Sequence, residues 1–334
     1  MRNTIFFLVS LAVALVIYFG LRAFGIDYLF VAGYVIVQYV VLATAWNILG
    51  GYTGYVNFGS AAFFAVGAYS SVTLITIATH IEDWFSESVA AALNTVFPLP
   101  IPVLVVIAGI VGGLIGYGMG YLTLRLRGAF FAIATLALAV VLATLVVNWE
   151  FVGGSSGAYV IAPAEMIFFK SYKEYLFALM LLMAVGSLVV ARAIERSKLG
   201  YGFAAIRDDE LAAEASGVPT LNLKLVATTL SGAMMAMAGA PFPYFIGFIQ
   251  PSSAFGLEYA VNSIAMPMIG GTLSWMGPLV GAVLLGTLQQ LANVTISSAV
   301  NLLIVGLLLI VFVIIAPNGI VGLVQDRLRA RRTK

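Results

Sequence analysis

Long apolar runs separated by short polar stretches cover almost the whole chain. Most of these runs are close to the roughly 20 residues that a helix needs to cross a hydrocarbon core about 30 Å thick. They lie at about residues 5–21, 28–49, 59–79, 102–124, 128–147, 175–194, 221–240, 258–270, 277–293 and 298–316. The pattern predicts an all-α integral membrane protein of about ten transmembrane helices, in a single membrane domain over residues 1–334.

Three of these runs, the first, the eighth and the ninth, allow a second interpretation. The eighth, 258–270, is short for a full crossing and precedes the pair Gly270–Gly271, so the eighth and ninth runs can also form a re-entrant hairpin. Residues 1–21 share features with a signal peptide, but Arg22 and Phe24 follow where the small residues of a cleavage site would stand. We therefore expect a retained membrane anchor.

Composition agrees with the apolar pattern and excludes several classes of site. Hydrophobic residues make up 62% of the chain and charged residues only 9%, against roughly 25% charged residues in soluble domains. Cysteine is absent and His80 is the only histidine, which excludes disulfides, thiolate nucleophiles and multi-histidine metal sites. The GxxxxGK[ST] motif of P-loop ATPases is absent too. We expect no cofactor, no metal, no nucleic-acid partner and no ATPase activity of the chain's own.

The distribution of basic residues predicts the orientation. If the N-terminus is cytoplasmic, the inner segments hold thirteen Lys and Arg residues, and the outer segments hold only Arg22, Lys170 and Lys173. Lys and Arg are retained on the cytoplasmic side of membranes. Both termini are therefore expected in the cytoplasm, with a basic tail at 324–334 that meets anionic membrane lipid.

One long polar stretch interrupts the apolar pattern, from Glu195 to Lys224, and the orientation places it in the cytoplasm. Its middle, 204–217, is predicted to form one short two-sided helix, with Asp208 and Asp209 in the first turn and Gly217 as the stop. The small side chains of the helix are expected to form a close-packing face. Such a short helix is marginal alone in water and needs a partner. We call residues 195–224 the coupling segment.

Glycine, proline and polar side chains interrupt the apolar pattern at two further places. Five glycines lie among residues 50–69, which predicts a broken helix at 51–59, and 241–253 holds prolines and aromatics. The alternatives are close helix packing at the first place and an interfacial aromatic belt at the second. The candidate residues of a translocation path are Asn57, Phe58, Ser60, Tyr244, Phe245, Asn262, Ser263 and Met266.

These path candidates are uncharged, and the middles of the apolar runs hold no ionisable residue, while Glu258 lies at the edge of its run. Proton relays normally use intramembrane ionisable groups, so a proton-driven pump is not expected. A small, partly apolar solute suits such a path. The two interruptions also permit an inverted repeat, with runs two to five related to runs seven to ten.

Several motifs occur in the order seen in one known family. They are GGYTGYVNFGSAAFFAVGAY, GGSSG, SKLGYGFAAIRDDELAAEASGV, IAMPMIGGTLSWMGPLVGAVLLG and APNGIVGL. The chain from about Gly50 to Leu323 thereby resembles the LivM-type permease subunits of branched-chain amino acid ABC importers. It departs from the family's usual residues at Ser60 and Val152, which bear on the solute.

The resemblance implies a set of partners and a location. Two cytoplasmic ATPase subunits would dock on the coupling segment, a second permease would complete a heterodimer, and a periplasmic or extracytoplasmic binding protein would deliver the solute. The location would be the cytoplasmic (inner) membrane of a bacterium or archaeon. The candidate ATPase-coupling residues are Ala205, Ile206, Arg207, Asp208, Asp209, Glu210, Ala212, Ala213 and Gly217. Replacing Ala213 by Trp would then block docking.

Alternatives stay open at this point. Urea, a short amide or another amino acid could be the solute, and a homodimer could replace the heterodimer. From other classes, an ion-coupled secondary carrier or channel would move solute without an ATPase, and a membrane scaffold would move none.

Overall fold

The fold is that of a computed structural model, which describes residues 2–84, 86–94, 97–161, 169–295, 303, 306–307, 310 and 319–324. Most of the predicted tenth run, 298–316, and the basic tail from residue 325 onward lie outside the described residues.

The described part is mostly helical. Its long helices are α1 (Arg2–Phe24), α2 (Asp27–Thr53), α3 (Ser60–Thr79), α6 (Ile101–Thr123), α7 (Ala129–Val147), α8 (Tyr172–Glu195), α11 (Thr220–Gly239) and α15 (Met276–Thr295). The shorter ones are α4 (Ile81–Trp84), α5 (Glu87–Asn94), α9 (Lys198–Asp208), α10 (Glu210–Ala215), α12 (Phe242–Ile246), α13 (Pro251–Ala254) and α14 (Leu257–Gly270). Two 3₁₀ turns, η1 (Glu150–Val152) and η2 (Gly154–Ser156), follow α7.

A two-stranded sheet and seven candidate spans complete this inventory. Strands β1 (Ala158–Tyr159) and β2 (Phe248–Ile249) pair antiparallel, with Ala158 opposite Ile249. By length and composition, 7 helical segments of the described chain can cross a membrane. They are Asn3–Phe24, Asp27–Thr53, Ser60–Thr79, Ile101–Thr123, Ala129–Val147, Tyr172–Glu195 and Thr220–Ile246. The prediction of an all-α membrane protein is thereby confirmed.

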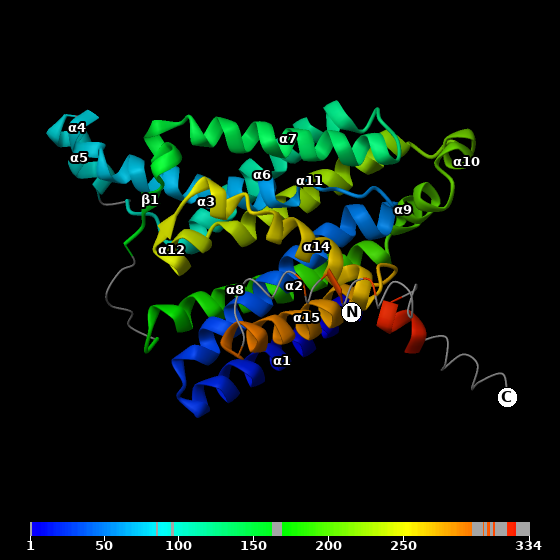
Figure 1. The fold of residues 1–334 in the computed structure, drawn as a ribbon, viewed down its shortest axis with the longest axis horizontal. Helices are drawn as coiled ribbons and strands as arrows, with labels where there is room; N and C mark the ends of the chain where they lie inside the picture. Colours follow the sequence, from blue (N-terminus) through cyan, green and yellow to red (C-terminus); the bar gives the residue numbers. More distant parts are fainter. Residues whose placement is uncertain are drawn as a thin grey trace.

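α7 runs along the longest axis of the molecule, and α1 and α2 run obliquely to it, as Figure 1 shows. α11 lies at the centre and packs against α6, α2 and α3. α7 and α1 lie at opposite edges of the bundle (Figure 1), and only 17% and 11% of their apolar windows are buried, against 72% for the segment that contains α11. The outer helices therefore expose apolar surface suited to lipid, and α11 forms the core.

Glycines allow α3 and α11 to approach until their backbones touch. A Cβ at Gly67 would overlap the carbonyl of Ala236, and a Cβ at Gly239 would overlap the carbonyl of Phe64. Small residues at such crossings replace the hydrophobic driving force that lipid does not supply.

The break after α2 differs from the one expected from sequence. Gly50 and Gly51 belong to α2, which continues to Thr53, and the chain leaves the helix at Gly54 with φ 77°. The chain then runs back beside α2, where the Trp46 indole N–H donates to the carbonyl of Asn57 at 2.9 Å. The break therefore covers residues 54–59, and α3 begins inside the bundle.

Candidate coupling site and buried polar path

The coupling segment forms two helices, α9 and α10, at one end of the bundle, while α4 and α5 lie at the opposite end (Figure 1). The predicted single helix over 204–217 is wrong. Asp208 is the last residue of α9, and Asp209 has an extended backbone with φ −160° and ψ 107°. The Asp209 carboxylate accepts the Ala212 N–H at 3.0 Å and so caps α10. An aspartate that bonds ahead to a free N–H favours a new helix start over continuation of the old one.

The predicted helix stop at Gly217 is confirmed, as the end of α10. Gly217 has φ +84°, and the N–H of Val218 donates to the carbonyl of Ala213 at 3.0 Å. This pattern is the usual glycine termination of a helix, in which the left-handed residue lets the chain satisfy the last carbonyls.

The exposed face of the two helices differs in part from the predicted one: the small residues Ala212 and Ala215 are exposed, but Ala213 is not. Ala213 is only 6% exposed and packs inside the chain, whereas Leu211 is 64% exposed and Tyr201 75% exposed. Ala205 is half-buried and Ile206 is buried. Replacement of Ala213 by Trp would therefore disturb the chain's own packing. The exposed residues of the two helices include Tyr201, Asp208, Leu211, Ala212 and Ala215. We call these five residues the docking face.

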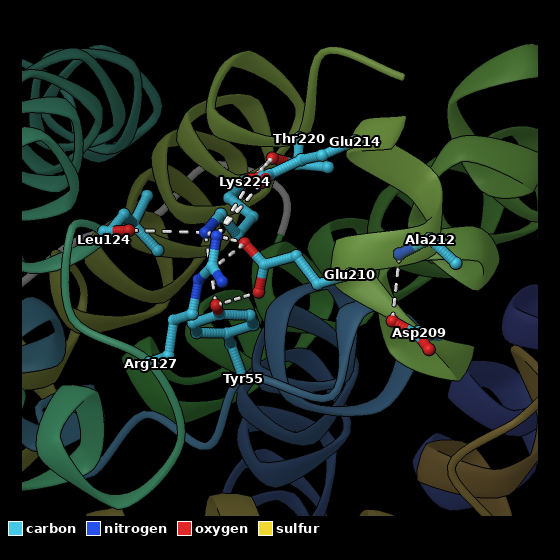
Figure 2. A network of polar contacts seen from close by, with 9 residues as sticks. All are labelled: Tyr55, Leu124, Arg127, Asp209, Glu210, Ala212, Glu214, Thr220 and Lys224. Atoms are coloured by element: carbon cyan, nitrogen blue, oxygen red, sulfur yellow. Dashed lines mark hydrogen bonds and ion pairs between the residues drawn. The ribbon is translucent and has the colours of Figure 1, made fainter. Parts of the chain in front are cut away.

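Beneath the docking face, a buried ion pair ties α10 to α11. The Lys224 ammonium lies 2.6 Å from Glu210 Oε1. It also donates to the hydroxyl of Tyr55 at 3.2 Å and to the carbonyl of Leu124 at 3.3 Å, as drawn in Figure 2. The Tyr55 hydroxyl donates in turn to the other oxygen of Glu210. All three ammonium protons of Lys224 therefore have an acceptor.

This pair is shielded from water. The Lys224 side chain is 3% exposed and that of Glu210 is 13% exposed. A buried charge is stable only when it is paired and hydrogen-bonded. Burial and the hydrogen bond to Glu210 raise the pKa of Tyr55 above its usual value, so its hydroxyl stays protonated and keeps donating.

A second, more exposed set of contacts runs beside the first (Figure 2). Arg127 lies 3.1 Å from Glu214 and 3.8 Å from Glu210. The Thr220 hydroxyl donates to Glu214 at 2.7 Å. This hydrogen bond, together with Arg127, holds the pKa of Glu214 below its usual range.

The contacts of the coupling segment reach four long helices. Tyr55 follows α2, Leu124 ends α6, Arg127 precedes α7, and Thr220 and Lys224 belong to the first two turns of α11. Arg207 of α9 packs at the turn that ends α2, where a Cβ on Gly54 would lie 3.3 Å from its Cγ. The coupling segment therefore contacts the ends of all four helices.

Sequence reasoning missed the network, because Tyr55, Thr220 and Leu124 received no role and the charges of Arg127 and Lys224 served only the orientation argument. One signal was present in the sequence. Lys224 lies inside an apolar run, where a charged residue requires a partner.

Part of the predicted path comes together in the bundle. The Ser263 hydroxyl of α14 donates to that of Ser60 at 2.9 Å. Asn262 donates to the Tyr39 hydroxyl at 3.0 Å and accepts from Gln289 at 2.8 Å. All five side chains are buried. Neutral hydrogen bonds therefore join α2, α3, α14 and α15. Two of the residues in these bonds, Tyr39 and Gln289, were not among the path candidates predicted from the sequence.

The other path candidates lie in different surroundings. Asn57 accepts the Gly59 N–H at 2.8 Å and stabilises the turn before α3, and Met266 is fully buried. Phe58 is 40% exposed. Tyr244 lines a cavity of about 610 Å³ with tyrosines of α8, and Phe245 stacks on Tyr34 with ring centroids 4.0 Å apart. Tyr244 and Phe245 thus lie apart from the hydrogen bonds that join Ser60, Asn262 and Ser263, although they pack on the same core.

Comparison with known proteins identifies the family. A family described as "Branched-chain amino acid transport system / permease component" matches residues 33–313. The high-affinity branched-chain amino acid transport system permease protein LivM of Salmonella typhimurium is 27% identical, over 88% of this chain and 70% of its own. LivM of Escherichia coli K12 is 26% identical over the same shares.

A second group of relatives carries another subunit name. The probable branched-chain amino acid transport permease protein LivH of Methanocaldococcus jannaschii is 26% identical, over 87% of this chain and 90% of its own. No solved structure matches the chain. The resemblance read from the motifs is confirmed, and the chain belongs to the family of branched-chain amino acid transport system permease components.

Proposed function

We propose that the chain forms part of the translocation path of an ATP-driven importer for branched-chain, hydrophobic amino acids. The observation that carries this proposal is the family match over residues 33–313 in a chain whose exposed α9–α10 end is tied by buried contacts to α2, α6 and α11. The relatives are named for branched-chain amino acids, so a branched-chain amino acid such as leucine is the first solute to test.

The energy would arrive through the docking face. The sequence has no P-loop motif, so ATP would be hydrolysed by two separate cytoplasmic subunits. Their closure would press on α10 and, through Glu210 and Lys224, tilt α2 and α11. Leu211 and Tyr201, exposed at an end of the bundle rather than at its lipid-facing edges, suit a groove on such a subunit. The candidate residues Arg207, Asp208, Asp209 and Glu210 form the polar rim and inner anchor of this contact.

Further subunits belong to the same proposal. This chain matches relatives named LivM and relatives named LivH, which supports pairing with a second, similar permease. An extracytoplasmic binding protein would deliver the solute to the end opposite α10. The positive-inside rule supports cytoplasmic termini in the inner membrane. The proposed arrangement has about ten spans, in which α1 is the first and α8 the sixth, and spans two to five and seven to ten are inverted repeats.

Uptake by the reconstituted transporter tests this proposal. We expect proteoliposomes that hold the permeases and ATPase subunits, with the binding protein outside, to accumulate radiolabelled leucine only when ATP is present inside. Accumulation of urea instead would show that the solute assignment is wrong. Leucine flux through this chain alone under a sodium or proton gradient would establish a carrier.

Docking is tested by Leu211→Asp. The side chain is 64% exposed, so the fold should tolerate the charge, while the affinity for the ATPase subunits should fall at least about tenfold, as for an interface hot spot. The matched control is Ile161→Asp, which places the same charge at a site 90% exposed and outside the coupling segment. Copurification of ATPase subunits with each variant measures the effect. Equal recovery with both variants would contradict docking on this face.

A further inference from the structure

Glu258 lies deeper in the bundle than its position at the edge of an apolar run suggests. It belongs to the first turn of α14, and the Tyr39 hydroxyl donates to its Oε1 at 3.4 Å. Tyr39 stands near the middle of α2, roughly 18 Å along the axis from Asp27. A hydrocarbon core is only about 30 Å thick. The Glu258 carboxylate is therefore at membrane depth.

At this depth the carboxylate has no cationic partner within the described residues. None of the ion pairs among the described residues includes Glu258. Its hydrogen-bond donor in this part of the chain is the Tyr39 hydroxyl. Its side chain is nevertheless exposed on the surface of this chain. An exposed carboxylate facing lipid at this depth is strongly unfavourable, so such residues face aqueous paths or find a cation.

The surroundings of Glu258 connect it to the buried polar contacts. Tyr39 accepts from Asn262, which lies one helical turn after Glu258, and Ser263 bonds to Ser60 of α3. The neighbouring Leu257 is 62% exposed. One anionic group beside exposed apolar surface, on a helix that packs against α15, α2 and α3, matches a solute with one ammonium group and an apolar side chain.

We propose that the Glu258 carboxylate, oriented by the Tyr39 hydroxyl, binds the ammonium group of a zwitterionic amino acid during its passage. This inference rests on the proposed function, and it adds the recognition group that the neutral path residues lack. Tyr39 acts as a positioning residue, since its hydroxyl holds both Glu258 and Asn262.

Because the chain contains no cysteine, Glu258→Cys introduces its only thiol. In the reconstituted transporter this variant should lose about tenfold or more of leucine uptake, the worth of a hydrogen bond to a charged group. A methanethiosulfonate bearing a sulfonate should restore part of the uptake by restoring the negative charge, and one bearing a trimethylammonium should not. Leucine should slow both modifications. The control Val140→Cys, 59% exposed on α7, should not react, because it faces lipid.

Three results would overturn the inference. They are leucine uptake by Glu258→Cys within twofold of the unmodified transporter, modification no faster than that of Val140→Cys, and equal rescue by both reagents. If the cysteine variant does not assemble, Glu258→Gln keeps the shape without the charge, and normal leucine uptake by that variant would overturn the inference. Absence of leucine uptake by the unmodified transporter would instead refute the proposed function.

Discussion

A lysine at the start of α11 shows what a single residue contributes to this molecule. Lys224 is 3% exposed, and its ammonium contacts Glu210, Tyr55 and the Leu124 carbonyl. Each contact comes from a different part of the chain. The side chain therefore acts as a junction that holds α10 against the ends of α2 and α6.

Removal of this junction should be costly. Lys224→Met leaves Glu210 buried without its closest cation, and we expect the free energy of unfolding to fall by about 3 kcal/mol. The double variant Glu210→Leu with Lys224→Met should lose less, because no buried charge is left unpaired. Denaturant titration in mixed micelles measures both values. Lys198→Met, at an exposed position, is the control and should change stability by less than about 0.5 kcal/mol. A Lys224→Met variant as stable as this control would contradict the role of the junction.

At the scale of helices, the contact between α3 and α11 depends on missing side chains. Gly67 and Gly239 let the two backbones touch, and Asp209 separates α9 from α10 by capping the second helix. The glycines bring α3 and α11 together, and the Asp209 cap divides one expected helix into α9 and α10. Both features determine how a displacement of α10 would be transmitted to α11.

A methyl group at Gly239 should separate the two helices. Its Cβ would overlap backbone atoms of Phe64 and Ala68, which cannot rotate away, so Gly239→Ala should lower the free energy of unfolding by about 1–3 kcal/mol. Gly118→Ala on α6 is the matched control, because nothing lies within 4 Å of its Cβ, and it should gain about 0.5–1 kcal/mol of helix stability. Unfolding in mixed micelles compares the two. A stable Gly239→Ala variant would mean that the helices are not in backbone contact.

For the whole molecule, the two ends of the bundle differ in chemistry. One end carries α9, α10 and the charged network, and the other carries α4 and α5 (Figure 1). Since basic residues are retained in the cytoplasm, the α9–α10 end is expected on that side. The proposed docking of ATPase subunits requires this orientation.

Single thiols test the orientation directly. In inside-out vesicles, a membrane-impermeant maleimide should label Leu211→Cys and leave Ile161→Cys unlabelled, and intact cells should give the reverse. Both side chains are largely exposed, at 64% and 90%, so access to the thiol is limited by the membrane and not by the fold. Labelling of Leu211→Cys from outside would refute the orientation and the docking proposal together.

The local sequence predicted what depends on local properties. Apolar runs of spanning length determine an all-α membrane protein, since a helix satisfies its own backbone groups in lipid. Gly217, followed by Pro219, predicts a helix stop, because glycine adopts the left-handed conformation that ends many helices and proline does not continue a helix. The motif order was enough to identify the family.

The tertiary structure decided which side chains face inward and which meet. The small-residue pattern of α10 does not reveal that Ala213 packs inside while Leu211 is exposed, because the direction of a short helix depends on what anchors it. Here the anchors are Lys224, on the next long helix, and Tyr55, which is distant from Glu210 in sequence. The depth of Glu258 likewise follows from its contact with Tyr39 and not from its place at the edge of a run. Hydropathy along a sequence measures how apolar each segment is, whereas depth and partners are set by contacts between segments.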